Sequence, residues 1–81
     1  MVIKGRRIHM FENKLDYWMD KRGLKNKHVA KLCGVSEQTF SKWRQNKTQP
    51  DLKAATIIAE ALSISVDQLI KGEDKENERS D

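Results

Sequence analysis

The amino-acid sequence predicts an all-α fold of five short helices around one hydrophobic core. In several segments apolar residues recur at intervals of three and four, as they do on one face of an α-helix. Residues that favour turns, such as Gly23, Gly34 and Pro50, separate these segments, and no segment is a convincing strand. A chain of 81 residues, 37% of them apolar, is long enough for one small domain with a single core.

The first two helices are expected at about residues 10–22 and 24–33. The pattern i, i+4, i+7, i+8, i+11 defines the first one through Phe11, Leu15, Trp18, Met19 and Arg22. This helix stops at Gly23. The second helix is expected to turn Val29, Ala30 and Cys33 toward the core. Gly34 then supplies the positive φ that a tight turn requires.

The third helix is expected to begin after Ser36, a good N-cap residue, and to run to about Arg44. At about 100° per residue, Phe40 and Trp43 fall on one side of this helix together with Thr39. The opposite side is polar and carries Glu37, Gln38, Ser41, Lys42 and Gln45. Phe40 and Trp43 would resemble a base-stacking platform if they were exposed, but the side they share favours packing in the core.

The last two helices follow a stretch rich in turn formers, residues 45–50. Pro50 disfavours helix at Gln49, and Asp51 is expected to cap the fourth helix. One apolar stripe of that helix consists of Ala54, Ala55, Ile58, Ala61 and Leu62. Ser65 and Gln68 have the spacing of a capping box, which predicts a fifth helix from residue 66 to residue 70 or 71.

The middle of the chain has the dimensions of a helix-turn-helix, formed by the second and third helices with Gly34 between them. We therefore divide the chain into an N-terminal arm (1–9), a helix-turn-helix domain (10–71) and a charged tail (72–81) that is expected to be disordered. Lys4, Arg6 and Arg7 could form a basic arm that enters a minor groove. A frayed terminus or a strand at a dimer contact is the favoured interpretation.

The charge of the chain is concentrated around the two central helices. The formal net charge is +4, but residues 21–53 alone carry nine bases and two acids, which is +7. Such a field suits a polyanionic partner and steers its association. A solvated basic surface without a partner is the plainer alternative.

Composition argues against a membrane protein, a zinc protein and an enzyme. No apolar run is long enough to span a bilayer and the first residues lack a signal peptide, so a cytoplasmic protein is expected. One Cys and two His are too few for a structural zinc site, and Cys33 is expected to be a small core residue. The chain has no nucleophilic triad, phosphate-cradling glycine loop or acidic metal cluster. We therefore expect no metal, no cofactor and no catalysis.

From Leu15 to Leu69 the sequence resembles the phage repressor and Cro group of DNA-binding regulators, the XRE family. The resemblance rests on the order and spacing of Gly23-Leu24, Val29-Ala30, Gly34-Val35-Ser36, Thr39, Lys47, Pro50, Leu52, Ile58-Ala59, Ala61-Leu62 and Asp67-Gln68-Leu69. It implies a five-helix, lambda repressor-like fold. Three positions depart from the family pattern: Arg44 replaces an acid, Asn46 replaces a glycine and Asn26 replaces a glutamine. Asn46 tolerates the left-handed conformation that a glycine would supply, so the turn is expected to be kept.

The resemblance implies double-stranded DNA as the partner and assigns the outer face of the third helix to the major groove. The residues expected to meet base edges are Glu37, Gln38, Ser41 and Lys42. The residues expected to contact phosphate are Asn26, Lys27, Thr39, Arg44, Asn46 and Lys47. His28 lies among the bases of the second helix and is expected to be solvated.

The function predicted from these residues is that of a sequence-specific transcriptional regulator that binds an operator as a homodimer. Repression is the preferred prediction for its effect on transcription. The dimer surface is expected to consist of Ile64, Val66, Leu69 and Ile70, although these residues could equally complete the monomer core. The alternative function is a protein-interaction module on the same fold, of the antitoxin or anti-repressor type, whose partner would be a protein such as an anti-repressor or a toxin. The clustering of lysine and arginine residues around the two central helices argues against a complete loss of DNA binding.

Overall fold

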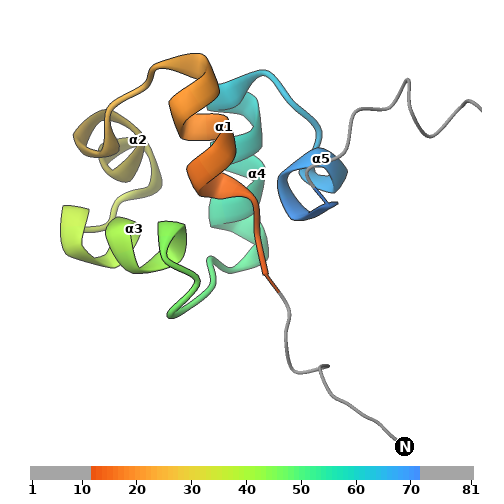
Figure 1. Ribbon diagram of the computed structural model, residues 1–81. Helices are drawn as coiled ribbons and strands as arrows, with labels where there is room; N and C mark the ends of the chain where they lie inside the picture. The colour runs from red at the N-terminus through yellow and green to blue at the C-terminus, as the bar shows by residue number, and fades with distance from the viewer. Residues whose placement is uncertain (1–11, 72–81) are drawn as a thin grey trace, which may run out of the picture.

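The computed structural model describes residues 12–71, which contain five α-helices and no strand. The helices are α1 (Leu15–Arg22), α2 (Asn26–Cys33), α3 (Glu37–Arg44), α4 (Leu52–Leu62) and α5 (Val66–Lys71). In the view of Figure 1, α4 passes behind α1, with α2 and α3 on one side of this pair and α5 on the other. The predicted all-α fold class is confirmed. The predicted arm and tail lie outside the described residues, as do residues 10 and 11 of the predicted domain.

The capping residues predicted from the sequence hold the starts of α3, α4 and α5. The Ser36 hydroxyl accepts from the Thr39 N–H at 3.1 Å, and an Asp51 carboxylate oxygen accepts from the Ala54 N–H at 2.8 Å. Ser65 and Gln68 form the expected capping box, in which each side chain accepts from the other residue's backbone N–H at 3.0 Å. These local bonds fix where each helix begins.

The first two helices begin later than the sequence pattern predicted. Residues 12–14 are not helical, because the Asn13 side chain accepts from the Leu15 N–H at 2.8 Å and its backbone N–H is engaged by Asn46. Leu24 was predicted to open the second helix. Instead its N–H donates to the Met19 carbonyl at 3.3 Å, as part of the cap of α1 at Gly23, and α2 begins at residue 26.

A polar cluster of Asn13, Asn46 and Gln49 joins the start of α1 to the turn between α3 and α4. Asn13 is 5% exposed, and its side-chain amide donates to the Trp43 carbonyl at 2.9 Å and to Gln49 at 2.7 Å. The Asn46 amide pairs with both backbone groups of Asn13, at 2.8 and 3.2 Å. Asn46 has φ 60°, so the predicted left-handed turn is confirmed. Its side chain adds hydrogen bonds to Asn13 that a glycine could not make.

The hydrophobic core is built by side chains of all five helices. Phe40, Leu15, Met19, Ile58, Leu62, Leu69 and Val29 are the largest fully buried side chains among the described residues. The Trp18 indole N–H donates to the Gln68 carbonyl at 3.0 Å, and the Arg22 guanidinium donates to the Leu62 carbonyl at 2.8 Å. These two bonds connect α1 to α5 and to the end of α4. No helix within residues 12–71 is long and apolar enough to cross a bilayer.

Cys33 lies at the end of α2, half-buried and packed against the core as predicted. It lines a surface hollow together with Asp51, Ala54 and Ile57. Burial raises the pKa of the thiol above its usual value, and the negative charge of Asp51 raises it further.

We predict that Asn13→Ala lowers the free energy of unfolding by about 1–3 kcal/mol, because it leaves the Leu15 N–H without its partner and removes one of the two hydrogen bonds to the Trp43 carbonyl. Urea denaturation measures this change. The exposed Glu60→Ala serves as the control and is expected to shift stability by less than about 0.5 kcal/mol. Equal effects of the two substitutions would show that the polar cluster does not stabilise the fold.

We also predict that Cys33 reacts slowly with iodoacetamide at pH 8, because its raised pKa lowers the thiolate fraction in the folded protein. The reaction should accelerate when urea unfolds the chain. The same shift has a sign for stability: the folded state holds the proton more tightly, so stability is lost as pH rises from the unfolded pKa through the folded pKa. A folded-state rate equal to that of free cysteine would contradict the assignment.

Candidate nucleic-acid interface

The turn between α2 and α3 fixes the angle between these two helices. Gly34 ends α2 with φ 74°, and its N–H donates to the Lys31 carbonyl at 3.1 Å. The Val35 N–H donates to the Ala30 carbonyl at 3.0 Å, which completes the cap. Ser36 then opens α3 two residues after Gly34. A turn this short leaves little freedom between the helices, so α3 is held rigidly against α2.

The apolar side of α3 is anchored in the core. Phe40 is 0% exposed and Trp43 is 6% exposed, and their rings meet edge to face with centroids 5.9 Å apart. The prediction that these aromatics pack rather than stack on bases is confirmed for the unbound chain. Because the two residues are three positions apart on one side of the helix, their burial turns the opposite side outward.

The outward side of α3 carries the side chains that were predicted to read bases. Glu37, Gln38 and Lys42 are exposed, and Ser41 is half-buried. The Gln45 side-chain amide donates to the Ser41 hydroxyl oxygen at 2.9 Å, so the hydroxyl retains its own hydrogen as a donor. Together the four residues present carboxylate, amide, hydroxyl and ammonium groups on one helix surface.

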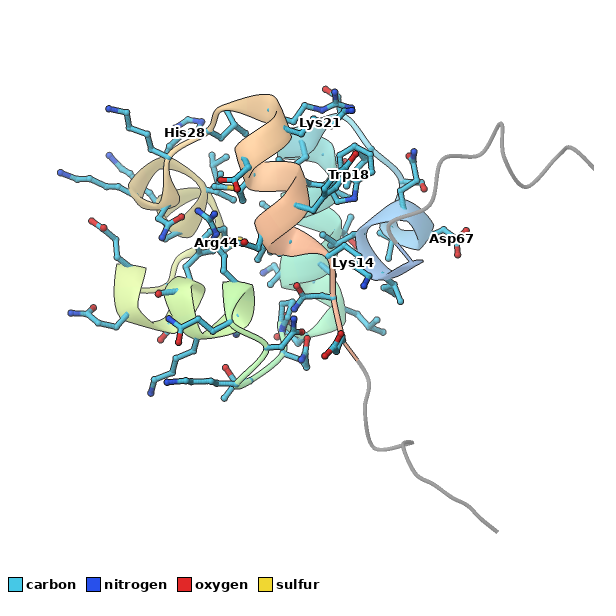
Figure 2. All side chains as sticks on the ribbon, viewed as in Figure 1. Lys14, Trp18, Lys21, His28, Arg44 and Asp67 are labelled. Carbon is cyan, nitrogen blue, oxygen red and sulfur yellow. The ribbon has the colours of Figure 1, made fainter. Side chains whose placement is uncertain are left out.

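Lysines surround this surface. Lys27 on α2 and Lys47 in the turn after α3 are exposed, as are Lys25 and Lys31. His28 is exposed on the outer side of α2, as predicted, where Figure 2 shows it pointing away from the rest of the molecule. Thr39 is half-buried, and its hydroxyl oxygen accepts from the Ser36 hydroxyl at 3.1 Å. Its own hydroxyl hydrogen remains available.

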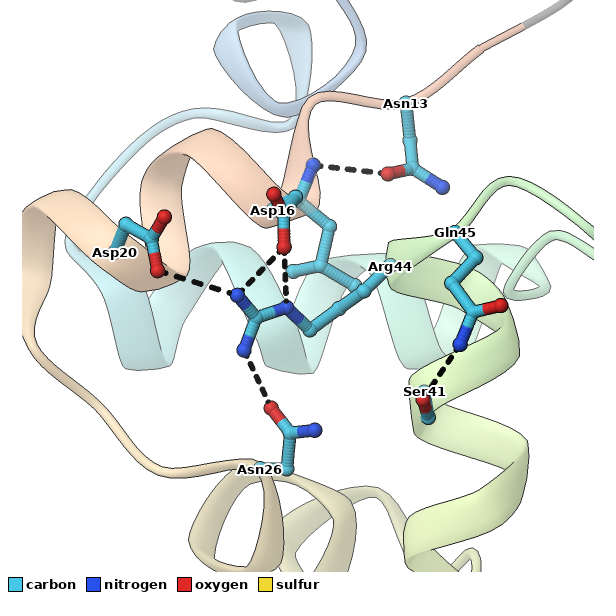
Figure 3. Close-up of polar contacts among 8 residues, drawn as sticks. Asn13, Asp16, Asp20, Asn26, Ser41, Arg44 and Gln45 are labelled. Atoms are coloured by element: carbon cyan, nitrogen blue, oxygen red, sulfur yellow. Dashed lines mark hydrogen bonds and ion pairs between the residues drawn. The ribbon is translucent and has the colours of Figure 1, made fainter.

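Arg44, which was predicted to contact phosphate, is bound by side chains of α1 and α2. Its Nε and Nη2 donate to one carboxylate oxygen of Asp16 at 2.9 and 2.6 Å, and Nη2 also reaches Asp20 at 3.3 Å. Its Nη1 donates to the Asn26 side-chain oxygen at 2.7 Å. Figure 3 shows the guanidinium between these three side chains, and the Arg44 side chain is only 20% exposed. The positive charge of Arg44 is therefore balanced by carboxylates of the protein itself.

Two other residues predicted to contact phosphate are engaged to different degrees. The Asn46 side chain is committed to Asn13 and Gln49, so its polar atoms hold the turn rather than point outward. Asn26 gives only its oxygen to Arg44, and its amide nitrogen Nδ2 has no hydrogen-bond partner among residues 12–71. The sequence pattern did not predict the Arg44–Asn26 and Asn46–Asn13 contacts, because the residues of each pair are at least 18 positions apart.

The residues predicted to form a dimer surface do not share one environment. Leu69 is 2% exposed and belongs to the core, as the alternative interpretation of these residues allowed. Ile64 is half-buried and packs against the core. Val66 and Ile70 are half-buried on α5. Only part of the predicted surface therefore remains accessible.

Two short helices with a fixed turn, an anchored apolar side and a polar outward side define a helix-turn-helix DNA-binding domain. Residues 14–75 match the model of the Cro/C1-type HTH DNA-binding domain, and the chain belongs to this family. The family is a class of DNA-binding proteins and not a class of enzymes.

Relatives with known names support this assignment. The chain is 32% identical over 63 residues to YonR, an uncharacterized prophage-derived HTH-type transcriptional regulator of Bacillus subtilis, covering 78% of this chain and 58% of YonR. It is 34% identical over 65 residues to MJ0272, an uncharacterized HTH-type transcriptional regulator of Methanocaldococcus jannaschii, covering 80% of this chain and 98% of that protein. The HTH-type transcriptional activator BcrR of Enterococcus faecalis is 28% identical over 64 residues, covering 79% of this chain and 31% of BcrR. The chain thus spans little more than half of YonR and about a third of BcrR.

Solved structures agree with the observed fold. A candidate DNA-binding protein from Bacteroides fragilis superposes with a TM-score of 0.70 at 33% identity, over 74% of this chain and 97% of that one. A transcriptional regulator from Listeria innocua superposes with a TM-score of 0.64 at 23% identity, over 74% of this chain and 60% of that one. The second likeness concerns the fold alone.

Proposed function

We propose that this chain is a sequence-specific regulator of transcription that inserts α3 into the major groove of an operator half-site. The observation that carries the proposal is the burial of Phe40 and Trp43, which leaves Glu37, Gln38 and Lys42 exposed together on the opposite side of α3. The helix-turn-helix family and the names of the relatives support DNA as the partner. Repression, through occupation of the operator, is the outcome that we propose.

The base-reading groups have complementary chemistry. Gln38 can donate to and accept from adenine at the same time, and Lys42 can donate to guanine O6 and N7. Glu37 can accept from the amino group of cytosine, and Ser41 can serve either kind of edge. Because all four lie on one helix surface, they would meet neighbouring base pairs of one half-site.

The phosphate contacts that we propose come from the edges of this surface. Lys27 and Lys47 supply charge, the Thr39 hydroxyl supplies a hydrogen bond, and Asn26 lies at the first turn of α2. Arg44 and Asn46 are left out of this set, because their side chains are engaged within the protein.

We propose that the chain binds DNA as a homodimer on two half-sites about 34 Å apart, since a single short helix contacts few base pairs. Val66 and Ile70 on α5 are the residues that we assign to the dimer contact, with the accessible part of Ile64 beside them. The protein acts in the cytoplasm and requires no cofactor.

Selection of duplexes from random DNA tests the proposal directly. We expect an enriched motif of two inverted half-sites whose spacing reports the dimer. In a gel-shift assay, affinity should fall steeply with salt, because each phosphate contact by a charged side chain displaces a counterion. If neither the selected nor a random duplex is shifted at tens of micromolar protein in low salt, the protein-interaction module is the better explanation.

We predict that Gln38→Ala and Lys47→Ala have different signatures. The first should cost about 1–3 kcal/mol on the selected site and relax specificity at one base position. The second should weaken binding to all sequences alike and reduce the salt slope by about one. Gel shifts on specific and random duplexes, at several salt concentrations, measure both effects.

Lys21→Ala is the matched control for Lys47→Ala, because Lys21 is exposed on α1 at the end of the molecule away from α3 (Figure 2). It removes the same charge and should change neither affinity nor slope beyond a small general effect. If Gln38→Ala and Lys47→Ala weakened specific and random binding equally, the proposed orientation of α3 would be wrong.

A further inference from the structure

A side-chain hydrogen bond links Arg44 to Asn26 across the helix-turn-helix. Arg44 Nη1 donates to Asn26 Oδ1 at 2.7 Å. The bond joins the last residue of α3 to the first residue of α2.

The guanidinium of Arg44 cannot turn freely toward DNA. Its other nitrogens are held by Asp16 at 2.9 and 2.6 Å and by Asp20 at 3.3 Å. Two carboxylates on one guanidinium leave this group of three charged side chains with a net charge of −1. The cluster as a whole therefore offers no cationic attraction for phosphate.

The same bond determines which end of the Asn26 amide is free. With Oδ1 held by Arg44, Nδ2 keeps two N–H donors and no partner among residues 12–71. Figure 3 shows Nδ2 turned away from the guanidinium. Asn26 is the first residue of α2 and is only half-buried, so its amide can be reached from outside the protein.

We propose that Arg44 is a positioning residue, which acts on DNA through Asn26 rather than by its own charge. Because Oδ1 accepts from Arg44, the Asn26 amide is held in the orientation that leaves Nδ2 free to donate to a phosphate oxygen. Asp16 and Asp20 hold the guanidinium in place, so α1, α2 and α3 all contribute to one phosphate contact. This inference rests on the proposed function, and it adds the residue that orients one of its phosphate contacts.

The test is a double-mutant cycle with the full chain, the duplex selected from random DNA and a random duplex. Asn26→Ala should weaken binding to both duplexes about tenfold without changing the salt slope, because a neutral donor is lost. Arg44→Lys keeps the charge but cannot hold Asp16, Asp20 and Asn26 together. It should weaken binding to a similar extent, and it should have no further effect in the Asn26→Ala background.

Several outcomes would overturn the proposal. If the effects of the two substitutions multiply, Arg44 acts independently of Asn26; if Arg44→Lys leaves binding unchanged, it does not act on DNA at all. Glu60→Gln is the control, since Glu60 is exposed on α4 and contacts neither Arg44 nor Asn26, and this variant should bind DNA at least as tightly as the unaltered chain. Failure of the unaltered chain to bind any duplex would instead refute the proposed function.

A second measurement covers the case in which Arg44→Lys does not fold. In ¹⁵N spectra of the unaltered chain, the side-chain Nδ2 resonances of Asn26 should shift when the selected duplex is added to saturation. A purely structural role for the Arg44–Asn26 bond predicts no such change. Unmoved resonances at saturation would therefore be decisive against the inference.

Discussion

The burial of Phe40 and Trp43 is the constraint on which the rest of the structure depends. A helix of eight residues has only two or three turns, so two anchored side chains determine its rotation about its own axis. Once these rings are buried in the core, the side chains of Glu37, Gln38 and Lys42 are exposed to solvent on the opposite side of the helix. The polar surface of α3 is thus a consequence of the hydrophobic core, and substitutions on that surface can change recognition while leaving the fold intact.

Rotation alone does not place a helix, and polar bonds at both ends of α3 supply the remaining restraints. At the start of α3, Gly34 and Ser36 set the angle to α2. At its end, Arg44 ties α3 to α1 and α2, and the next residue but one, Asn46, ties the following turn to Asn13. Hydrogen bonds impose direction where apolar contacts do not, so these bonds give the packed helix a fixed orientation.

Most of the fold was predictable because its signals are local. The caps at Ser36, Asp51 and Ser65 act within three residues, and the apolar stripe of α4 repeats within one helix. The start of α1 was not predictable in this way, because it depends on Asn46, which is 33 residues from Asn13. For the same reason Arg44 was assigned to phosphate: its partner Asp16 is 28 residues away, and no periodicity connects the two. The exposure of the α3 surface was predictable from periodicity, but the hydrogen-bond partners of individual polar atoms were not.

Within residues 12–71, arginine and lysine side chains have different roles. Both arginines, Arg22 and Arg44, direct their guanidinium groups to partners within the fold, one to the Leu62 carbonyl and the Trp18 ring, the other to Asp16 and Asn26. The exposed Lys and Arg side chains around α2 and α3 within these residues are all lysines. A planar guanidinium can donate to several fixed acceptors at once, whereas the ammonium of lysine is a compact charge on a flexible stem. The fold therefore uses arginine where several acceptors must be held in one geometry and lysine where only charge near the surface is needed, and the charge of Arg44 that the sequence count includes is balanced by Asp16 and Asp20.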